Sequence, residues 1–297
     1  MIPTDAMLID LAPPGRIGEA TGFIMACGMI GRNIGPLFGG TIQWFAVSSG
    51  LSELDSYRVP YFVDAGFAAI SALLITFGIK ESKVESIKTE GSENRKHIKI
   101  PRQFKVLLLC AFVTGIGEGF IRPIFVLFFS DVFGAEPLEI GLLMTMSGFI
   151  ARFASWLSGR VSDRFGRKIV IAFGGIPARI LGVFIPLSAT HDMASIFYTL
   201  RSFTWRVYNV GVRALRSDLA PLEIRGRLFG AYRTFFDVGD MIGPVMATYL
   251  YDVYRFQTFQ VGGFTIPGYG IPFYLNSALG LVTIMMLLAF VKTNKHT

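Results

Sequence analysis

The chain has few residues of the kinds that build metal sites, disulfide frameworks and catalytic centres. Among its 297 residues there are two cysteines, Cys27 and Cys110, and three histidines. Two cysteines that both lie in apolar runs offer no disulfide framework and no cysteine-rich metal site. The motifs of nucleophile-elbow hydrolases, HExxH peptidases and Walker-loop nucleotidases are also missing from the sequence. We therefore expect no enzyme, no metal site, no cofactor and no transport driven by nucleotide hydrolysis.

Charged residues are scarce as well. They make up 16% of the chain, against 52% hydrophobic residues, whereas soluble globular domains carry about 25% charged residues. This composition predicts a membrane protein, because lipid tolerates such a surface and water does not. A membrane-spanning helix needs about 20 mostly apolar residues. Eight segments meet that need and predict an all-α protein with eight transmembrane helices: residues 17–46, 60–79, 104–130, 138–158, 169–189, 194–213, 227–251 and 271–291.

The positions of the basic residues predict how the chain lies in the membrane. If the spans alternate in direction, nineteen of the 28 Lys and Arg residues lie in loops or tails on one side, and Arg58 and Arg255 lie on the other. Lys and Arg accumulate on the cytoplasmic side of a membrane, so both termini and the polar segment 81–103 are predicted to be cytoplasmic. This bias accounts for the net charge of +7 without a nucleic-acid partner. No basic segment precedes an apolar core at the N-terminus, so we expect no cleavable secretion signal.

A ten-residue polar segment, GRVSDRFGRK, joins two of the apolar runs. It resembles the signature loop of the major facilitator superfamily of secondary transporters, Gly-x-x-x-Asp-Arg-x-Gly-Arg-Lys, at Gly159, Asp163, Arg164, Gly166, Arg167 and Lys168. Because glycine adopts positive φ at little cost, Gly159 and Gly166 are expected to reverse the chain. In the family, the carboxylate at the position of Asp163 contacts a helix N-terminus of the other half, where the helix dipole favours an anion. The resemblance implies that this loop helps to hold the cytoplasmic side closed.

An internal repeat runs through the chain at an offset of 208 residues. Asp-Leu-Ala-Pro occurs at 10–13 and again at 218–221, and matching glycines follow in both copies. The superfamily has twelve helices in two six-helix halves. Four predicted helices lie between the two copies and none precedes the first, so the resemblance implies helices five to twelve of such a bundle.

This layout predicts three parts: residues 1–80 as the end of the first half, 81–103 as a cytoplasmic linker, and 104–297 as the complete second half. Truncation, a wrong start codon or a split gene whose other fragment supplies the first four helices would each explain it. A complete eight-helix protein is the competing interpretation.

Glycines in the first predicted helix resemble the antiporter motif of the same family, Gly-x-x-x-Gly-Pro-x-x-Gly-Gly with a further glycine nine residues upstream. The matching residues are Gly22, Gly31, Gly35, Pro36, Gly39 and Gly40. Small residues on one helix face permit close helix contact, and in the family this face meets the other half and limits proton leak. The second copy keeps Gly239, Gly243 and Pro244 but has Ala247 and Thr248 in place of the glycine pair. The pattern therefore fits either antiport or a packing feature common to both repeats.

Charged residues inside the predicted helices are functional candidates, because they are costly in lipid. The acids Asp240, Glu118 and Asp237 are candidates for proton coupling, which requires a carboxylate that burial can drive to its neutral form. Helical spacing allows Glu118 to pair with Arg122 and Asp237 with Arg233, whereas Asp240 has no such partner within one turn and is the first choice. An arginine-aromatic stripe on residues 198–208 suits a cavity wall. The candidates for a substrate cavity are Arg32, Arg122, Arg201, Trp205 and Arg233.

The resemblance implies a multi-pass transporter in the cell membrane that works by alternating access. The glycine motif favours proton-coupled export of small organic molecules. Seven arginines against three acids inside the helices keep a second hypothesis open, a facilitator or symporter of a metabolite anion. The third hypothesis is a truncated product without transport activity of its own. The identity of the cargo and the oligomeric state do not follow from the sequence.

Overall fold

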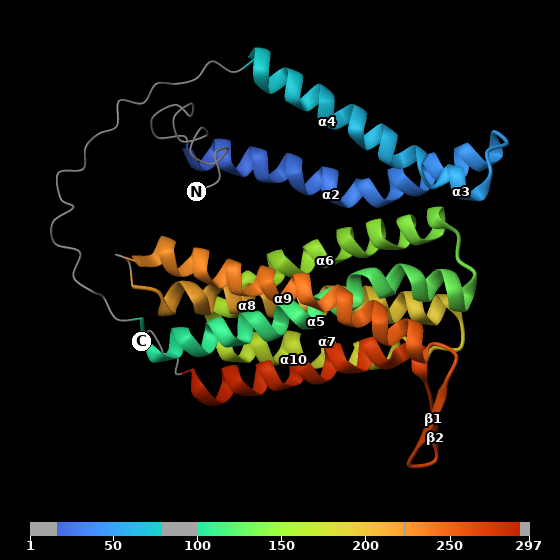
Figure 1. The fold of residues 1–297 in the computed structure, drawn as a ribbon. Coiled ribbons are helices and arrows are strands. Elements are labelled where there is room, and N and C mark those ends of the chain that lie inside the picture. Colours follow the sequence, from blue (N-terminus) through green and yellow to red (C-terminus); the bar gives the residue numbers. More distant parts are fainter. Residues whose placement is uncertain (1–16, 79–99, 222–223, 292–297) are drawn as a thin grey trace. The chain divides into compact units, whose positions relative to one another are not determined.

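The structure, a computed structural model, describes residues 17–78, 100–221 and 224–291. Within them lie eight long helices, one in each predicted apolar segment, which confirms the helical prediction (Figure 1). The polar segment 81–103 falls outside the described residues except for its last four. The long helices are α2 (Ile17–Ser48), α4 (Val59–Gly78), α5 (Arg102–Phe133), α6 (Pro137–Phe165), α7 (Arg167–Phe184), α8 (His191–Leu219), α9 (Arg225–Tyr254) and α10 (Ile271–Phe290).

Three of the described helical segments are long and apolar enough to cross a membrane by length and composition alone: Glu53–Gly78, Arg102–Phe133 and Gly268–Phe290. The other long helices are more polar. Helix α8, for example, has four arginines and two aspartates between His191 and Leu219. Polar residues of this kind need partners inside a bundle, and several of them find such partners in the second of the two units described below.

Single residues mark several helix ends. Thr190 caps α8, because its side chain accepts a hydrogen bond from the Met193 amide at 3.3 Å. Gly134 ends α5 in the left-handed conformation, with φ of 65°. Gly166 stands alone between α6 and α7 with φ of 90° and so makes the predicted reversal by itself. The expectation for Gly159 was wrong, since this residue continues α6.

The chain divides into two compact units. In the described residues, one unit contains α2, the short helix α3 (Glu53–Ser56), α4 and the first nine residues of α6, from Pro137 to Thr145. The other contains α5, the rest of α6 and α7 to α10, together with a hairpin of β1 (Thr258–Val261) and β2 (Phe264–Pro267) and the 3-10 turn η3 (Gly268–Gly270). Helix α6 is continuous and contributes to both units.

The repeat is visible in the helices. Helices α2 and α9 begin 208 residues apart, at Ile17 and Arg225, whereas α4 and α10 begin 212 residues apart. The difference arises mainly in the connection, which holds α3 in the first copy and the longer hairpin segment in the second (Figure 1). The hairpin was not predicted, although Gly262 and Gly263, with φ of 57° and 85°, form the two-residue turn that favours one.

Glycines bring α5 and α9 together backbone to backbone in the second unit. A Cβ atom on Gly115 would overlap the Phe236 carbonyl oxygen, and one on Gly239 would overlap that of Phe112. A Cβ atom on Gly119 would lie 2.9 Å from the Gly243 Cα, and one on Gly243 would lie 2.8 Å from the Gly119 Cα. Both helices thus carry a Gly-x-x-x-Gly pair at their contact, the arrangement that permits close packing in membranes. The predicted packing role of Gly239, Gly243 and the adjacent Pro244 agrees with this contact.

The first-copy glycines behave differently. In the first unit, a Cβ atom on Gly40 would overlap the Pro137 carbonyl oxygen of α6, so this glycine does permit close contact. Gly31, Gly35 and Gly39 have no atom of the described chain within 4 Å of such a Cβ. The expected contact of these three glycines with the other half therefore stays a prediction.

The two remaining positions of the antiporter-like motif on α2 are Pro36 and Gly22. Helix α2 continues through Pro36, whose carbonyl oxygen faces Gly141 of α6. The side chains around Gly22 lie outside the described part.

Candidate functional site

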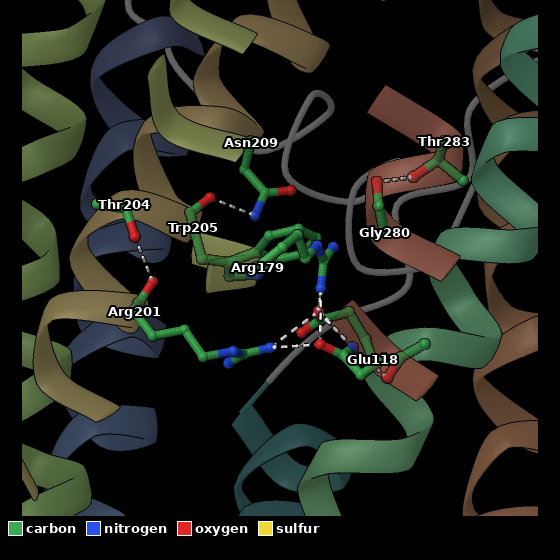
Figure 2. Close-up of polar contacts among 10 residues, drawn as sticks. Glu118, Arg179, Arg201, Thr204, Trp205, Asn209, Gly280 and Thr283 are labelled. Atoms are coloured by element: carbon green, nitrogen blue, oxygen red, sulfur yellow. Dashed lines mark hydrogen bonds and ion pairs between the residues drawn. The ribbon is translucent and has the colours of Figure 1, made fainter. Parts of the chain in front are cut away.

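Buried charged side chains gather inside the second unit, where α5, α7, α8 and α10 meet (Figure 2). Glu118 of α5 accepts hydrogen bonds at Oε1 from Arg179 Nη1 of α7 at 3.3 Å and from Arg201 Nη2 of α8 at 3.2 Å. Asn276 of α10 accepts at Oδ1 from Arg179 Nη1 at 2.8 Å and donates through Nδ2 to the Gly117 carbonyl oxygen. We call Glu118, Arg179, Arg201 and Asn276 the charge cluster.

The charge cluster is shielded from the surroundings. Arg179 is 1% exposed, Arg201 4% and Glu118 9%. A buried charge without a partner costs several kcal/mol, and here one carboxylate faces two guanidinium groups. Arg179 gains a second partner in Trp205, because its Cζ lies 4.5 Å from the indole centroid and the ring face attracts a cation. The cluster nevertheless holds one more positive than negative group.

Two glycines lie beside the arginine side chains of the charge cluster. A Cβ atom on Gly280 of α10 would overlap the Arg179 guanidinium. One on Gly182 of α7 would lie 2.9 Å from Ser277 Oγ and 3.6 Å from Arg201 Nε. The long side chain of Arg179 can therefore reach Glu118 only because α10 lacks a side chain at Gly280, whereas Gly182 makes room for Ser277 and would leave Arg201 at ordinary contact distance.

The charge cluster keeps unused hydrogen-bond donors. Nε of Arg179 and Nε of Arg201 are buried and have no hydrogen-bond partner in the described part of the chain. Buried donors are normally satisfied. The arrangement can therefore accept one more anionic or acceptor group than the four side chains supply.

A separate ion pair joins α5 to α9. Arg122 Nη1 lies 2.9 Å from Asp240 Oδ2, with the Arg122 side chain 67% exposed and that of Asp240 19% exposed. The Glu118–Arg122 pair that the helical spacing had suggested does not form. Asp240 was expected to have no partner within one turn of its own helix, and its partner indeed comes from another helix. Glu118 faces the bundle interior, whereas Arg122, one turn later, reaches the neighbouring helix. The close approach at Gly119 brings that helix within range.

The remaining candidates on α9 and α2 are more exposed. Arg233 Nε lies 2.8 Å from Asp237 Oδ2, so the pair expected from the helical spacing does form, with side chains 72% and 46% exposed. Arg32, at the position that the repeat relates to Asp240, is exposed on α2. These residues are not part of the charge cluster.

The arginine-aromatic stripe of α8 does not line an open wall, contrary to the expectation. Arg201 and Tyr208 are buried, at 4% and 2% exposure, and Trp205 stacks on Tyr208 with ring centroids 4.9 Å apart. Sequence reasoning also missed Arg179 and Asn276 as members of the cluster. One signal for Asn276 was available, since an amide in the otherwise apolar run 271–291 requires a polar partner.

The signature loop ties the start of α7 to other helices. Arg167 Nε lies 3.1 Å from Asp218 Oδ2 near the end of α8. Lys168 Nζ donates to the Leu288 carbonyl oxygen near the end of α10 at 2.7 Å. The side-chain surroundings of Gly159, Asp163 and Arg164 lie outside what the structure describes. The predicted contact of Asp163 with a helix N-terminus therefore stays a prediction.

Comparison with protein families gives one match along the chain. The model described as Major Facilitator Superfamily matches residues 1–106 and 107–297. Among curated proteins, the chain is 26% identical over 264 residues to Multidrug resistance protein MdtG of Rahnella sp. (strain Y9602), covering 86% of this chain and 61% of that protein. It is 24% identical over 272 residues to Multidrug resistance protein 2 of Bacillus subtilis (strain 168), covering 88% and 65%. The chain thus spans less than two thirds of the length of these relatives.

Solved structures show the same fold. A bacterial homolog to the human lysosomal transporter Spinster, in an inward-facing and unoccupied conformation, superimposes with a TM-score of 0.66 at 16% sequence identity. The alignment covers 96% of this chain and 71% of that one. The occupied inward-facing form of the same homolog also gives a TM-score of 0.66.

Proposed function

Because the chain belongs to the major facilitator superfamily of transporters, we propose that it exports small organic molecules across the cell membrane by alternating access, in exchange for protons. The observation that carries the export direction is the similarity to two bacterial proteins named for multidrug resistance. The charge cluster and the Arg122–Asp240 pair supply ionisable groups inside the helical bundle, as a coupled transporter requires.

In this proposal, residues 104–297 form one six-helix half, and α2 with α4 forms the end of the other half. Helices α2 and α9 begin 208 residues apart, which is the offset of the internal repeat, and this agreement supports the assignment. Both termini and the segment 81–103 lie in the cytoplasm, since the basic residues gather there. The signature loop is then also cytoplasmic, with Asp163 closing that side.

The contacts change the order of the proton-coupling candidates. Protonation of Glu118 would leave two buried guanidinium groups without a counter-ion, so we assign Glu118 a structural role. Asp240 faces one arginine that is largely exposed and can move away. We therefore propose that proton uptake and release accompany opening and closing of the Arg122–Asp240 pair. Asp237 is the more exposed alternative.

The test uses everted membrane vesicles from cells that express the chain together with any coding sequence that continues in frame upstream of Met1. An inside-acid pH gradient is imposed, and uptake of a fluorescent cationic dye is followed. The proposal predicts uptake that stops when a protonophore collapses the gradient. Uptake that is unchanged by the protonophore would exclude proton coupling, and no uptake of any dye in a panel of cations, neutral compounds and anions would exclude export.

A second candidate function is transport of a metabolite anion. The observation that favours it is the positive excess of the charge cluster, with unused donors on Arg179 and Arg201. Right-side-out vesicles that take up a carboxylate without any proton gradient would support a facilitator. Expressing the 297-residue chain without upstream sequence, in the same assays, tests the third hypothesis of a product that does not transport by itself.

A further inference from the structure

A pocket of about 440 Å³ lies between α8 and α9 in the second unit, apart from the charge cluster. Helix α8 packs mainly on α7 and α9 on α5, and the described residues that line the pocket all belong to α8 and α9. Its walls are unusually basic and aromatic for an intramembrane site. The residues that matter below are Asn209, Arg213 and Arg216 of α8 and Phe229, Tyr232 and Arg233 of α9.

We propose that this pocket binds the phosphate group of an anionic ligand. Three of its lining residues are arginines, and none is acidic. Asp237 pairs with Arg233, but no carboxylate in the described part of the chain is within ion-pair distance of Arg213 or Arg216. Guanidinium groups bind phosphate through paired hydrogen bonds, and a phosphate would supply the counter-charge that the walls lack.

The central arginine is held in place before any ligand arrives. The Cζ atom of Arg216 lies 4.6 Å from the ring centroids of both Phe229 and Tyr232. Its Nε is buried and has no hydrogen-bond partner among the described residues. Arg213 is three residues away on the same helix and exposed, so both guanidinium groups can reach the same face. A fixed arginine beside an exposed one can bind a phosphate from two directions.

The depth of the pocket suits a phosphate at the membrane surface. Arg216 lies three residues and Asn209 ten residues before the last residue of α8, which at 1.5 Å per residue places the pocket roughly 5 to 15 Å from the helix end. On the orientation proposed above, that end is cytoplasmic, where lipid phosphates lie and basic pockets between helices bind anionic headgroups. Phe236, seven residues further into α9 than Phe229, would then face the apolar part of the ligand. Only this leaflet assignment rests on the proposed function.

The experiment measures binding, not transport, so it stands apart from the test of export. The purified full chain in a neutral detergent is titrated with phosphatidylglycerol and, separately, with zwitterionic phosphatidylcholine, and bound lipid is counted by native mass spectrometry. We expect phosphatidylglycerol to bind at least about ten-fold more tightly, because it carries a net charge. The double variant Arg213→Gln/Arg216→Gln should lose this preference. Arg227→Gln, which removes an exposed charge at the start of α9 outside the pocket, should retain it.

Two further arms separate the sources of the phosphate. If inorganic phosphate or glycerol phosphate displaces phosphatidylglycerol, the site takes soluble phosphates; if neither does, it is a lipid site, and both results support the proposal. Equal binding of the two lipids would overturn it. If the double variant does not fold, the single variant Arg213→Gln, which changes an exposed residue, replaces it in the titration. If it binds phosphatidylglycerol as tightly as Arg227→Gln does, the pocket is not the site.

Discussion

Arg122 of α5 and Asp240 of α9 form an ion pair of 2.9 Å between two helices that touch through four glycines. In the proposed mechanism, this pair opens and closes as the proton is taken up and released. Its arginine is 67% exposed and its carboxylate 19% exposed, and Asp240 Oδ1 has no hydrogen-bond partner among the described residues. The carboxylate therefore has one described counter-ion, and that arginine is largely exposed.

Replacement of Asp240 by asparagine should uncouple transport from the pH gradient. The variant cannot release a proton, so we expect gradient-driven dye uptake to fall to the level measured without a gradient. Exchange of dye across the membrane without a gradient should persist. Asp237→Asn is the matched control on the same helix. If the two variants behave alike, Asp240 has no special place in coupling.

Glu118→Gln should destabilise the protein strongly. Removal of the charge leaves Arg179 and Arg201 buried without a carboxylate, and breaking a buried ion pair in this way costs about 3 to 5 kcal/mol. The melting temperature of the purified chain in detergent should fall by roughly 5 to 10 °C. Asp192→Asn, at a side chain that is 94% exposed, serves as the control and should melt like the native chain. A native-like melting temperature for Glu118→Gln would contradict the structural role.

Gly280→Ala should also lower the melting temperature, through Arg179. The added methyl group would overlap the guanidinium, so Arg179 must leave Glu118 or α10 must move, at a cost of roughly 1 to 3 kcal/mol. Gly230→Ala is the control, since a Cβ there meets no described atom within 4 Å and alanine favours a helix by about 0.5 to 1 kcal/mol. The prediction fails if the two alanine variants melt together.

Gly239→Ala and Gly31→Ala test the repeat with equivalent substitutions. A methyl group at Gly239 would overlap the backbone of α5, whereas one at Gly31 has open space in the described structure. We expect Gly239→Ala to destabilise the chain by about 1 to 3 kcal/mol and to weaken the Arg122–Asp240 pair, and Gly31→Ala to stabilise the chain by up to about 1 kcal/mol, because alanine favours a helix. Denaturant unfolding followed by tryptophan fluorescence measures both. Equal losses would mean that Gly31 meets a surface outside the described residues.

The eight helices could be predicted because each is encoded locally, by a stretch of helical length that is rich in apolar residues, even where, as in α8, polar residues interrupt it. The reversal at Gly166 was predictable for the same reason. The partners of Glu118 and Asp240 were not, because they lie on other helices, 61 and 118 residues away along the chain for Arg179 and Arg122. The spacing within one helix suggested that Glu118 pairs with Arg122. The glycines bring α5 so close to α9 that Arg122 pairs with Asp240 instead.

The single-residue junction at Gly166 leaves the chain no slack between α6 and α7. One inserted residue would turn everything after it by about 100° and advance it by about 1.5 Å along the helix axis. Arg167 and Lys168 would then point away from Asp218 and from the Leu288 carbonyl oxygen, which they now hold. The length of this connection therefore sets the rotational register of α7, and the Arg179 side chain reaches Glu118 only in that register.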